Sequence, residues 1–175
     1  MLPVMAELPY TRLPDVPAAP GARAVMVRLV DGLGFRYRWA TEGLSDTDAD
    51  FRPAEGCMSL RELLDHVAEL VHWVIEQMGF EAEPPAAEFD AVRKRTLDDI
   101  VAVREHLLGM DDETLAAITV VARKNRTGTF WHLINGPLAD ALTHVGQINA
   151  WRRLDGKPTP RVDVFMGRPP KDQAP

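Results

Sequence analysis

The stretch that decides the fold is NGPLADALTHVGQINAWRRLDG, from Asn135 to Gly156. Its apolar residues return at helical spacing, which predicts an amphipathic helix that begins near Phe130 or after Asn135. The helix is expected to end near Gly156, because glycine commonly follows the last helical turn. Pro137 is expected either to kink this helix or to occupy its first turn.

The helical wheel of this segment, drawn at about 100° per residue, separates an apolar side from a polar flank. The core side is expected to contain Leu138, Ala141, Leu142, Val145 and Asn149. Asp140 and His144 lie one turn apart on the flank, together with Trp151, and Gln147 follows a little further on. A carboxylate and an imidazole therefore share one face of the helix, beside residues of the core.

A second helix with the same layout is predicted from Ser59 to about Gly79. Ser59 is a good N-cap, Glu62 completes a capping box, and Gly79 is a natural C-cap. The core face is expected to contain Leu60, Leu64, Val67, Val71, Val74 and Met78. His66 and Trp73 lie on the flank of that face, so both helices place a histidine beside the core and a tryptophan seven residues later.

Two further helices and a hairpin complete the predicted architecture. One helix is expected over about Gly21 to Gly43, with its core side formed by Val25, Leu29, Leu33, Tyr37 and Ala40. The other is expected over about Ala87 to Leu108, with its core side formed by Phe89, Val92, Thr96, Ile100, Val103 and Leu107. Between Leu115 and Thr129, β-branched residues flank a turn-like segment, which favours a short β-hairpin. The sequence thus predicts an all-α four-helix bundle.

The chain of 175 residues suits a single domain. Residues 1–20 and 157–175 are rich in proline, so an extended N-terminal arm and an extended C-terminal tail are expected on either side of a bundle at 21–156.

Charge and cysteine content exclude several classes of function. The net charge of −6 and the pI of about 5.3 argue against a nucleic-acid-binding protein. Cys57 is the single cysteine, so neither an intramolecular disulfide nor a cysteine-based zinc site is expected. No signal peptide and no membrane-spanning segment is recognised, so the protein is expected to be cytoplasmic and to bind no membrane.

If the polar flanks of the two helices face each other, His66, Asp140 and His144 converge at one end of the bundle. Imidazole and carboxylate groups are good ligands for zinc, nickel, iron or manganese. Three protein ligands leave coordination positions open for water or substrate, as catalytic metal sites require. The alternative is that these are hydrogen-bonded structural residues at the edge of the core, which are common on helices.

The segments SLRELLDHVA, from Ser59 to Ala68, and NGPLADALTHVGQI, from Asn135 to Ile148, resemble the second-helix and fourth-helix motifs of the DinB-like superfamily. This superfamily is also called the YfiT-like putative metal-dependent hydrolases. The resemblance covers about residues 20–160 and includes the trailing RRLDGKP from Arg152 to Pro158.

The resemblance implies an up-down-down-up four-helix bundle that is often a homodimer. It also implies a divalent metal, commonly zinc or nickel, bound by three histidines. His66 and His144 match the first and last of these histidines, and Asp140 replaces the middle one. A carboxylate shifts the preference toward harder ions such as iron or manganese, or leaves a weak site. Characterised relatives include transferases and isomerases that use low-molecular-weight thiols, and some hydrolases.

Several other residues are candidates for the substrate pocket: Trp73, Gln147, Trp151 and His132. His72 is expected to be exposed, and Arg152 and Arg153 either cap their helix or bind an anionic substrate. Two functions remain open. One is a metal-dependent hydrolase or thiol-dependent transferase that acts on a small molecule. The other is a non-catalytic dimeric binding or stress-response protein with a degenerate metal site.

Overall fold

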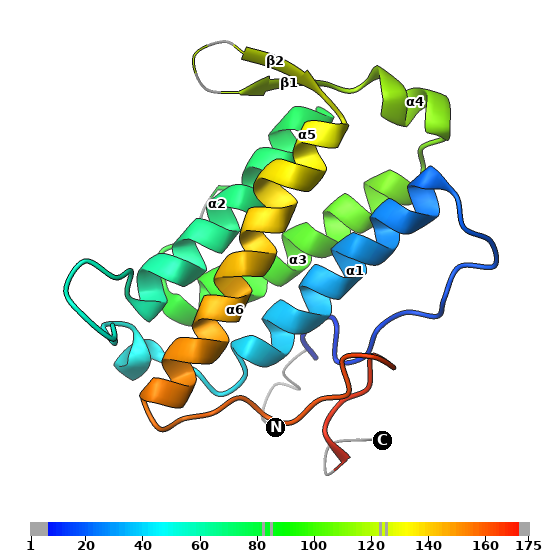
Figure 1. Ribbon diagram of the computed structural model, residues 1–175. Coiled ribbons are helices and arrows are strands. Elements are labelled where there is room, and N and C mark those ends of the chain that lie inside the picture. Colours follow the sequence, from blue (N-terminus) through cyan, green and yellow to red (C-terminus); the bar gives the residue numbers. More distant parts are fainter. Residues whose placement is uncertain (1–6, 82, 85, 123, 125, 172–175) are drawn as a thin grey trace, which may run out of the picture.

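The computed structural model describes residues 7–81, 83–84, 86–122, 124 and 126–171. In this part of the chain, long helices form a bundle: α1 (Ala22–Ala40), α2 (Leu60–Met78), α3 (Phe89–Leu108) and α6 (Ala139–Leu154). Figure 1 shows α6 across the front of the bundle, between α2 and α1, with α3 behind. The predicted helical bundle is therefore confirmed, and residues 1–6 and 172–175 of the two expected arms lie outside the described residues.

The order of the helices around the bundle is α1, α3, α2, α6, because α1 and α2 each contact both α3 and α6. Contacts between helix ends give the directions. Arg152 near the end of α6 bonds to Ala40 at the end of α1, so these two helices run parallel. Arg104 of α3 pairs with Asp31 of α1, and α3 runs the opposite way to α1. The topology is up-down-down-up, as the family resemblance implies.

The bounds of α2 follow from its two caps. The Ser59 side chain accepts a hydrogen bond from the Glu62 amide, and the Glu62 carboxylate accepts one from the Ser59 amide. Gly79 ends the helix in the left-handed region at a φ of 78°, where glycine has no steric cost. Both ends of this helix agree with the sequence prediction.

The core of the bundle is formed largely by the expected stripes, with corrections on α6 and α1. On α6, Leu142 and Asn149 are only half-buried, and the buried stripe is Ala141, Val145, Ile148 and Arg152. Val25 is 63% exposed and does not belong to the core. The buried positions Met26, Val30, Leu33 and Tyr37 centre about 110° further around the helix than Val25. The spacing of the apolar residues predicted the helix correctly, but an extra apolar residue at its first turn shifted the predicted face.

The predicted hairpin is confirmed between α3 and the last long helix. Strands β1 (Thr119–Ala122) and β2 (Arg126–Thr129) are antiparallel, with Thr119 opposite Thr129 and Ala122 opposite Arg126. The short helix α4 (Asp112–Ala117) precedes the hairpin and was not predicted. Its N-cap is Asp111, whose side chain accepts a hydrogen bond from the Thr114 amide.

The fourth helical segment starts early and is kinked. It begins as α5 (Trp131–Leu133), continues through a wide turn labelled η3 (Ile134–Leu138), and then becomes α6. Gly136 leaves the helical region there, with φ −93° and ψ −108°, directly before Pro137. Because proline has no amide hydrogen to donate, the helix cannot continue regularly at this point. The kink is thus confirmed, and α6 carries the polar flank below it.

A charged network links the C-terminal end of α1 to α3 and α6. The Glu42 carboxylate, just after α1, pairs with Arg38 of α1 and Arg93 of α3. Burial would raise the pKa of the Glu42 carboxyl, but the two guanidinium groups hold that pKa below its usual range. Buried Arg152 of α6 adds hydrogen bonds to the carbonyl oxygens of Ala40, Glu42 and Lys157. These contacts fix how α6 is seated against α1.

Candidate metal centre

Three side chains from two antiparallel helices meet on the α2–α6 side of the bundle. His66 of α2 and both Asp140 and His144 of α6 each offer a ligand atom, and these atoms all lie within 4.8 Å of one another. Nε2 of His66 is 3.7 Å from Oδ2 of Asp140, and Nε2 of His144 is 3.4 Å from Oδ1. The two imidazole rings meet edge to face at a centroid distance of 4.6 Å. The expected convergence is present.

Gln147 determines which nitrogen of His144 faces the centre of the cluster. Nδ1 of His144 donates a hydrogen bond to Oε1 of Gln147 at 2.7 Å. A neutral imidazole whose Nδ1 carries the proton has its lone pair on Nε2. The ring of His144 is thereby held with an acceptor nitrogen toward Asp140. Gln147, expected at a substrate pocket, orients a candidate ligand in this structure.

Glu69 plays the corresponding part for His66, and the sequence analysis did not identify it. Its Oε2 is 3.5 Å from Nδ1 of His66, one helical turn away on α2. Metal-binding histidines usually direct their second nitrogen at a carboxylate, a carbonyl or a similar acceptor. A glutamate three residues after a candidate histidine was the signal in the sequence, although exposed acids at that spacing are common on helices.

When both imidazoles carry their hydrogen on Nδ1, the cluster brings acceptor atoms together without a donor between them. With both Nδ1 atoms directed outward, the two Nε2 lone pairs and the Asp140 carboxylate oxygens all face one another. Facing lone pairs repel each other, and a positive charge among them, a metal ion or a proton, turns the repulsion into attraction. The arrangement is therefore suited to a cation.

The separations also match those of metal ligands. Atoms that are about 2.0–2.2 Å from a tetrahedral ion lie about 3.3–3.6 Å from one another. The two distances to the Asp140 oxygens, 3.4 and 3.7 Å, are at or close to this range. The side chain of His144 is 13% exposed, that of His66 33% and that of Asp140 50%. One edge of the cluster is thus buried, and the opposite edge is open to solvent.

The remaining pocket candidates lie elsewhere. Trp73 is half-buried against the core, and the indole N–H of Trp151 donates to the carbonyl oxygen of Met58 at 2.8 Å. Exposed His132 accepts a hydrogen bond from the Thr129 amide at the hairpin. His132 is also twelve residues before His144, a rise of about 18 Å along a helix. The structure does not bring these three side chains into the cluster, and their role at a pocket remains a prediction.

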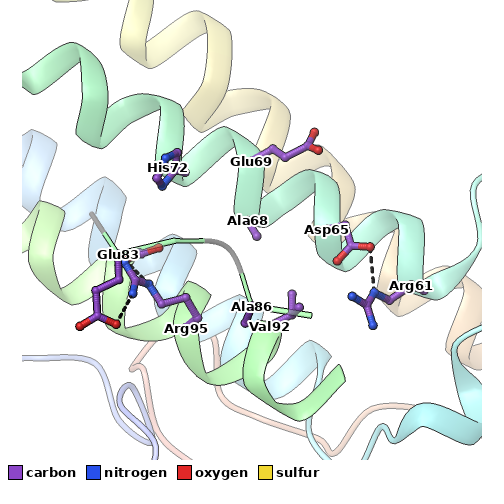
Figure 2. A pocket seen from close by; sticks show the side chains of 10 residues that line it. Arg61, Asp65, Ala68, Glu69, His72, Glu83, Ala86, Val92 and Arg95 are labelled. Carbon is purple, nitrogen blue, oxygen red and sulfur yellow. Dashed lines mark hydrogen bonds and ion pairs between the residues drawn. The ribbon is translucent and has the colours of Figure 1, made fainter. Parts of the chain in front are cut away.

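A separate cavity of about 320 Å³ lies between α2 and α3 (Figure 2). Its charged residues are largely paired with each other: Arg61 with Asp65, and Arg95 with both Asp99 and Glu83. His72, which the wheel places in solvent, is half-buried in its lining. The cavity lining includes Glu69 but none of the three clustered side chains.

Comparison with known proteins identifies the family. The sequence profile of the DinB superfamily matches residues 35–151, and the chain belongs to this superfamily. The chain is similar to the crystal structure of a DinB-like protein, YjoA, from Bacillus subtilis, with a TM-score of 0.62 and 17% sequence identity. The likeness covers 82% of this chain and 98% of that chain, and at this identity it shows a shared fold. No curated protein matches the chain.

Among the residues that the structure describes, no helix combines the length and the apolar character that crossing a bilayer requires.

Proposed function

We propose that this protein binds a divalent metal ion through His66, Asp140 and His144 and uses it in chemistry on a small molecule. The supporting observation is the set of acceptor atoms within 4.8 Å of one another, with Gln147 holding the acceptor nitrogen of His144 inward. Two imidazoles and one carboxylate suit zinc, nickel, iron or manganese. The donor set therefore fits the metal that the family resemblance implies.

Each residue has a defined part in this proposal. His66 and His144 supply neutral nitrogen ligands, and Asp140 supplies an anionic oxygen that offsets part of the metal charge. Glu69 and Gln147 accept the Nδ1 protons and so hold the two rings in the binding orientation. The exposed side of Asp140 leaves room for a small molecule to approach.

The proposed reaction class is hydrolysis or transfer of a low-molecular-weight thiol. A divalent ion lowers the pKa of a nearby water or thiol and so supplies a nucleophile near neutral pH. The protein contributes by directing Nε2 of both histidines toward Asp140 and by burying one side of the cluster, which directs reactants to the exposed side.

The second candidate is a non-catalytic bundle in which a metal, or a proton, stabilises the α2–α6 contact. One observation favours it. The cavity between α2 and α3, the cavities along α1 and the cavity under the hairpin are lined by residues other than the three clustered ones. The homodimer implied by the family resemblance remains a prediction under either candidate.

The test is the metal content of untagged protein purified without chelator, measured by elemental mass spectrometry. Wild type is expected to hold near-stoichiometric metal, and His144→Ala to lose it. His132→Ala is the matched control, because it removes an exposed histidine outside the cluster. Metal-free wild type whose melting temperature does not respond to added zinc, nickel, iron or manganese would falsify metal binding.

Activity then separates the two candidates. Metal-loaded wild type is assayed with ester substrates and with a thiol plus an electrophile, beside His144→Ala. Turnover that requires both the metal and His144 supports the enzyme. A protein that binds and is stabilised by metal, yet turns over neither substrate class, is the non-catalytic bundle.

A further inference from the structure

The opposite side of α6 carries a second feature, which is independent of the metal centre. Two cavities of about 500 and 250 Å³ lie along the seam between α1 and α6, and the smaller one reaches the C-terminal tail. They adjoin, because Arg36 and Asn149 line both. We call this continuous depression the α1–α6 groove.

The lining of the α1–α6 groove is positively charged. Arg28 and Arg36 come from α1, Arg153 from α6, and Arg161 from the tail, and no aspartate or glutamate is among the lining residues of the two cavities. The chain as a whole has a net charge of −6. Four arginines without a neighbouring acid in the lining therefore contrast with the average surface of this protein.

These arginines also differ in their contacts from several other arginines of the bundle. Within the described part of the chain, none of the four forms an ion pair, whereas Arg38, Arg61, Arg93, Arg95 and Arg104 all do. Three of them donate hydrogen bonds to backbone carbonyls. Arg28 donates to Pro14 at 2.8 Å, Arg36 to Gly32 at 3.2 Å and Arg153 to Asn149 at 3.5 Å. Each uses one Nη1 group, and a guanidinium has five N–H donors, so most donors of the groove remain available.

Apolar side chains line the floor between these charges. Leu29, Leu142 and Val145 contribute to the larger cavity, and Asn149 adds an amide at the junction of the two cavities. Gly32 and Gly146 add no side chain to the lining of the larger cavity. An occupant thus meets apolar surface in the middle and cationic donors along the edges.

We propose that the α1–α6 groove binds an organic anion that has an apolar body and a carboxylate or phosphate group. The guanidinium fork matches both acidic groups in geometry. The apolar floor favours an alkyl or aromatic body over a fully polar ion. The cavity between α2 and α3 is a weaker candidate, because its arginines are already neutralised by Asp65, Asp99 and Glu83.

The test is titration calorimetry of full-length protein with octanoate and with octyl phosphate below their micellar concentrations, and octanol serves as the uncharged ligand. Arg36→Gln/Arg153→Gln is compared with Arg126→Gln/Arg168→Gln, which removes the same charge outside the groove. The groove variant is expected to bind the anions about tenfold more weakly, and the control variant to bind like wild type. The hydrogen bonds of both groove arginines stay within their own helices, so folding should be preserved.

His144→Ala separates the groove from the metal centre, because it should keep the groove binding. Higher salt should weaken the binding of both anions to wild type. The ratio of the two affinities shows whether carboxylates or phosphates are preferred. Equal affinities in the two double variants, or equal binding of octanol, would overturn the proposal. A wild-type dimer that binds neither anion and dissociates in the groove variant would assign this face to a second copy of the chain and also overturn it.

Discussion

The two flanks of α6 have opposite chemistry. The flank that faces α2 presents acceptors, the Asp140 carboxylate and Nε2 of His144, to a third acceptor on His66. The flank that faces α1 borders a groove with arginine donors, including Arg153. One surface is suited to a cation and the other to an anion, although a single helix separates them.

The helical period explains how one helix keeps these surfaces apart. At about 100° per residue, Asp140, His144 and Gln147 fall on one stripe, and Leu142, Asn149 and Arg153 fall on another, about 150–175° from the centre of the first. Between them runs the buried stripe of Ala141, Val145, Ile148 and Arg152. Since the buried stripe separates the flanks, we expect substitutions on one flank to leave ligand binding on the other unchanged, unless they displace α6 from the bundle.

The largest expected effect is on stability, from removing the hydrogen bonds by which Arg152 holds α6 against α1. This loss should disturb both flanks of α6 together. Arg152→Met removes the donors that satisfy the carbonyls of Ala40, Glu42 and Lys157, and it leaves these acceptors partly buried. We expect the free energy of unfolding to fall by about 3 kcal/mol. Urea denaturation with an unchanged m-value measures the effect.

Arg153→Met is the matched control for Arg152→Met. Arg153 is exposed and its hydrogen bond stays within its own helix, so its loss should change stability by about 0.5 kcal/mol or less. Equal destabilisation by the two variants would show that Arg152 does not seat the helix through the three carbonyls.

The sequence predicted the acceptor cluster on one flank of α6 but not the arginine groove on the other. The convergence of His66, Asp140 and His144 could be predicted, because two amphipathic helices with capping signals carried them at the same position relative to the core. Ser59 and Gly79 fixed the ends of α2 through local chemistry that needs no tertiary information.

The groove could not be predicted in this way. Its arginines come from α1, α6 and the tail, and only the packing of these three segments brings them together in one groove. The short helix α4 was not predicted, because six residues carry little periodicity. The exposure of Val25 was not predicted, because the first turn of a helix need not contact its neighbours. Glu69 escaped because its role depends on which way His66 points.

A second prediction sharpens the contrast on the metal flank. Gln147→Leu removes the acceptor for Nδ1 of His144 while keeping a similar volume, so the ring can rotate or change tautomer. We expect metal affinity to fall by about 10–100-fold. Competition with a chromogenic chelator measures it. Octanoate binding should be unchanged, and a matching loss there would mean that the flanks are coupled.

Asp140→His tests how the carboxylate sets metal preference. The substitution removes one negative charge and replaces an oxygen ligand by a nitrogen, which favours zinc or nickel over manganese. We expect the ratio of zinc to manganese affinity to rise by about tenfold, as measured by competition with a chelator. Asp140→Asn, which removes the charge without adding a nitrogen ligand, should lower the affinity for both metals. A ratio that does not differ between Asp140→His and wild type would show that residue 140 is not a ligand.

The smallest expected effect is the change in the free energy of unfolding on replacing Gly146, which lines the groove. Gly146 lies within α6, and an added Cβ would meet no atom within 4 Å, so Gly146→Ala should gain helix propensity without a clash. We expect the free energy of unfolding to rise by about 0.5–1 kcal/mol, measured by urea denaturation, with metal content unchanged. Gly34→Ala is the opposing case, because its Cβ would lie 2.4 Å from the ring of Tyr10 and should destabilise. If Gly146→Ala destabilised as well, the seam between α1 and α6 would be filled in solution, and a second chain packed on this face would explain both that result and any failure to bind anions.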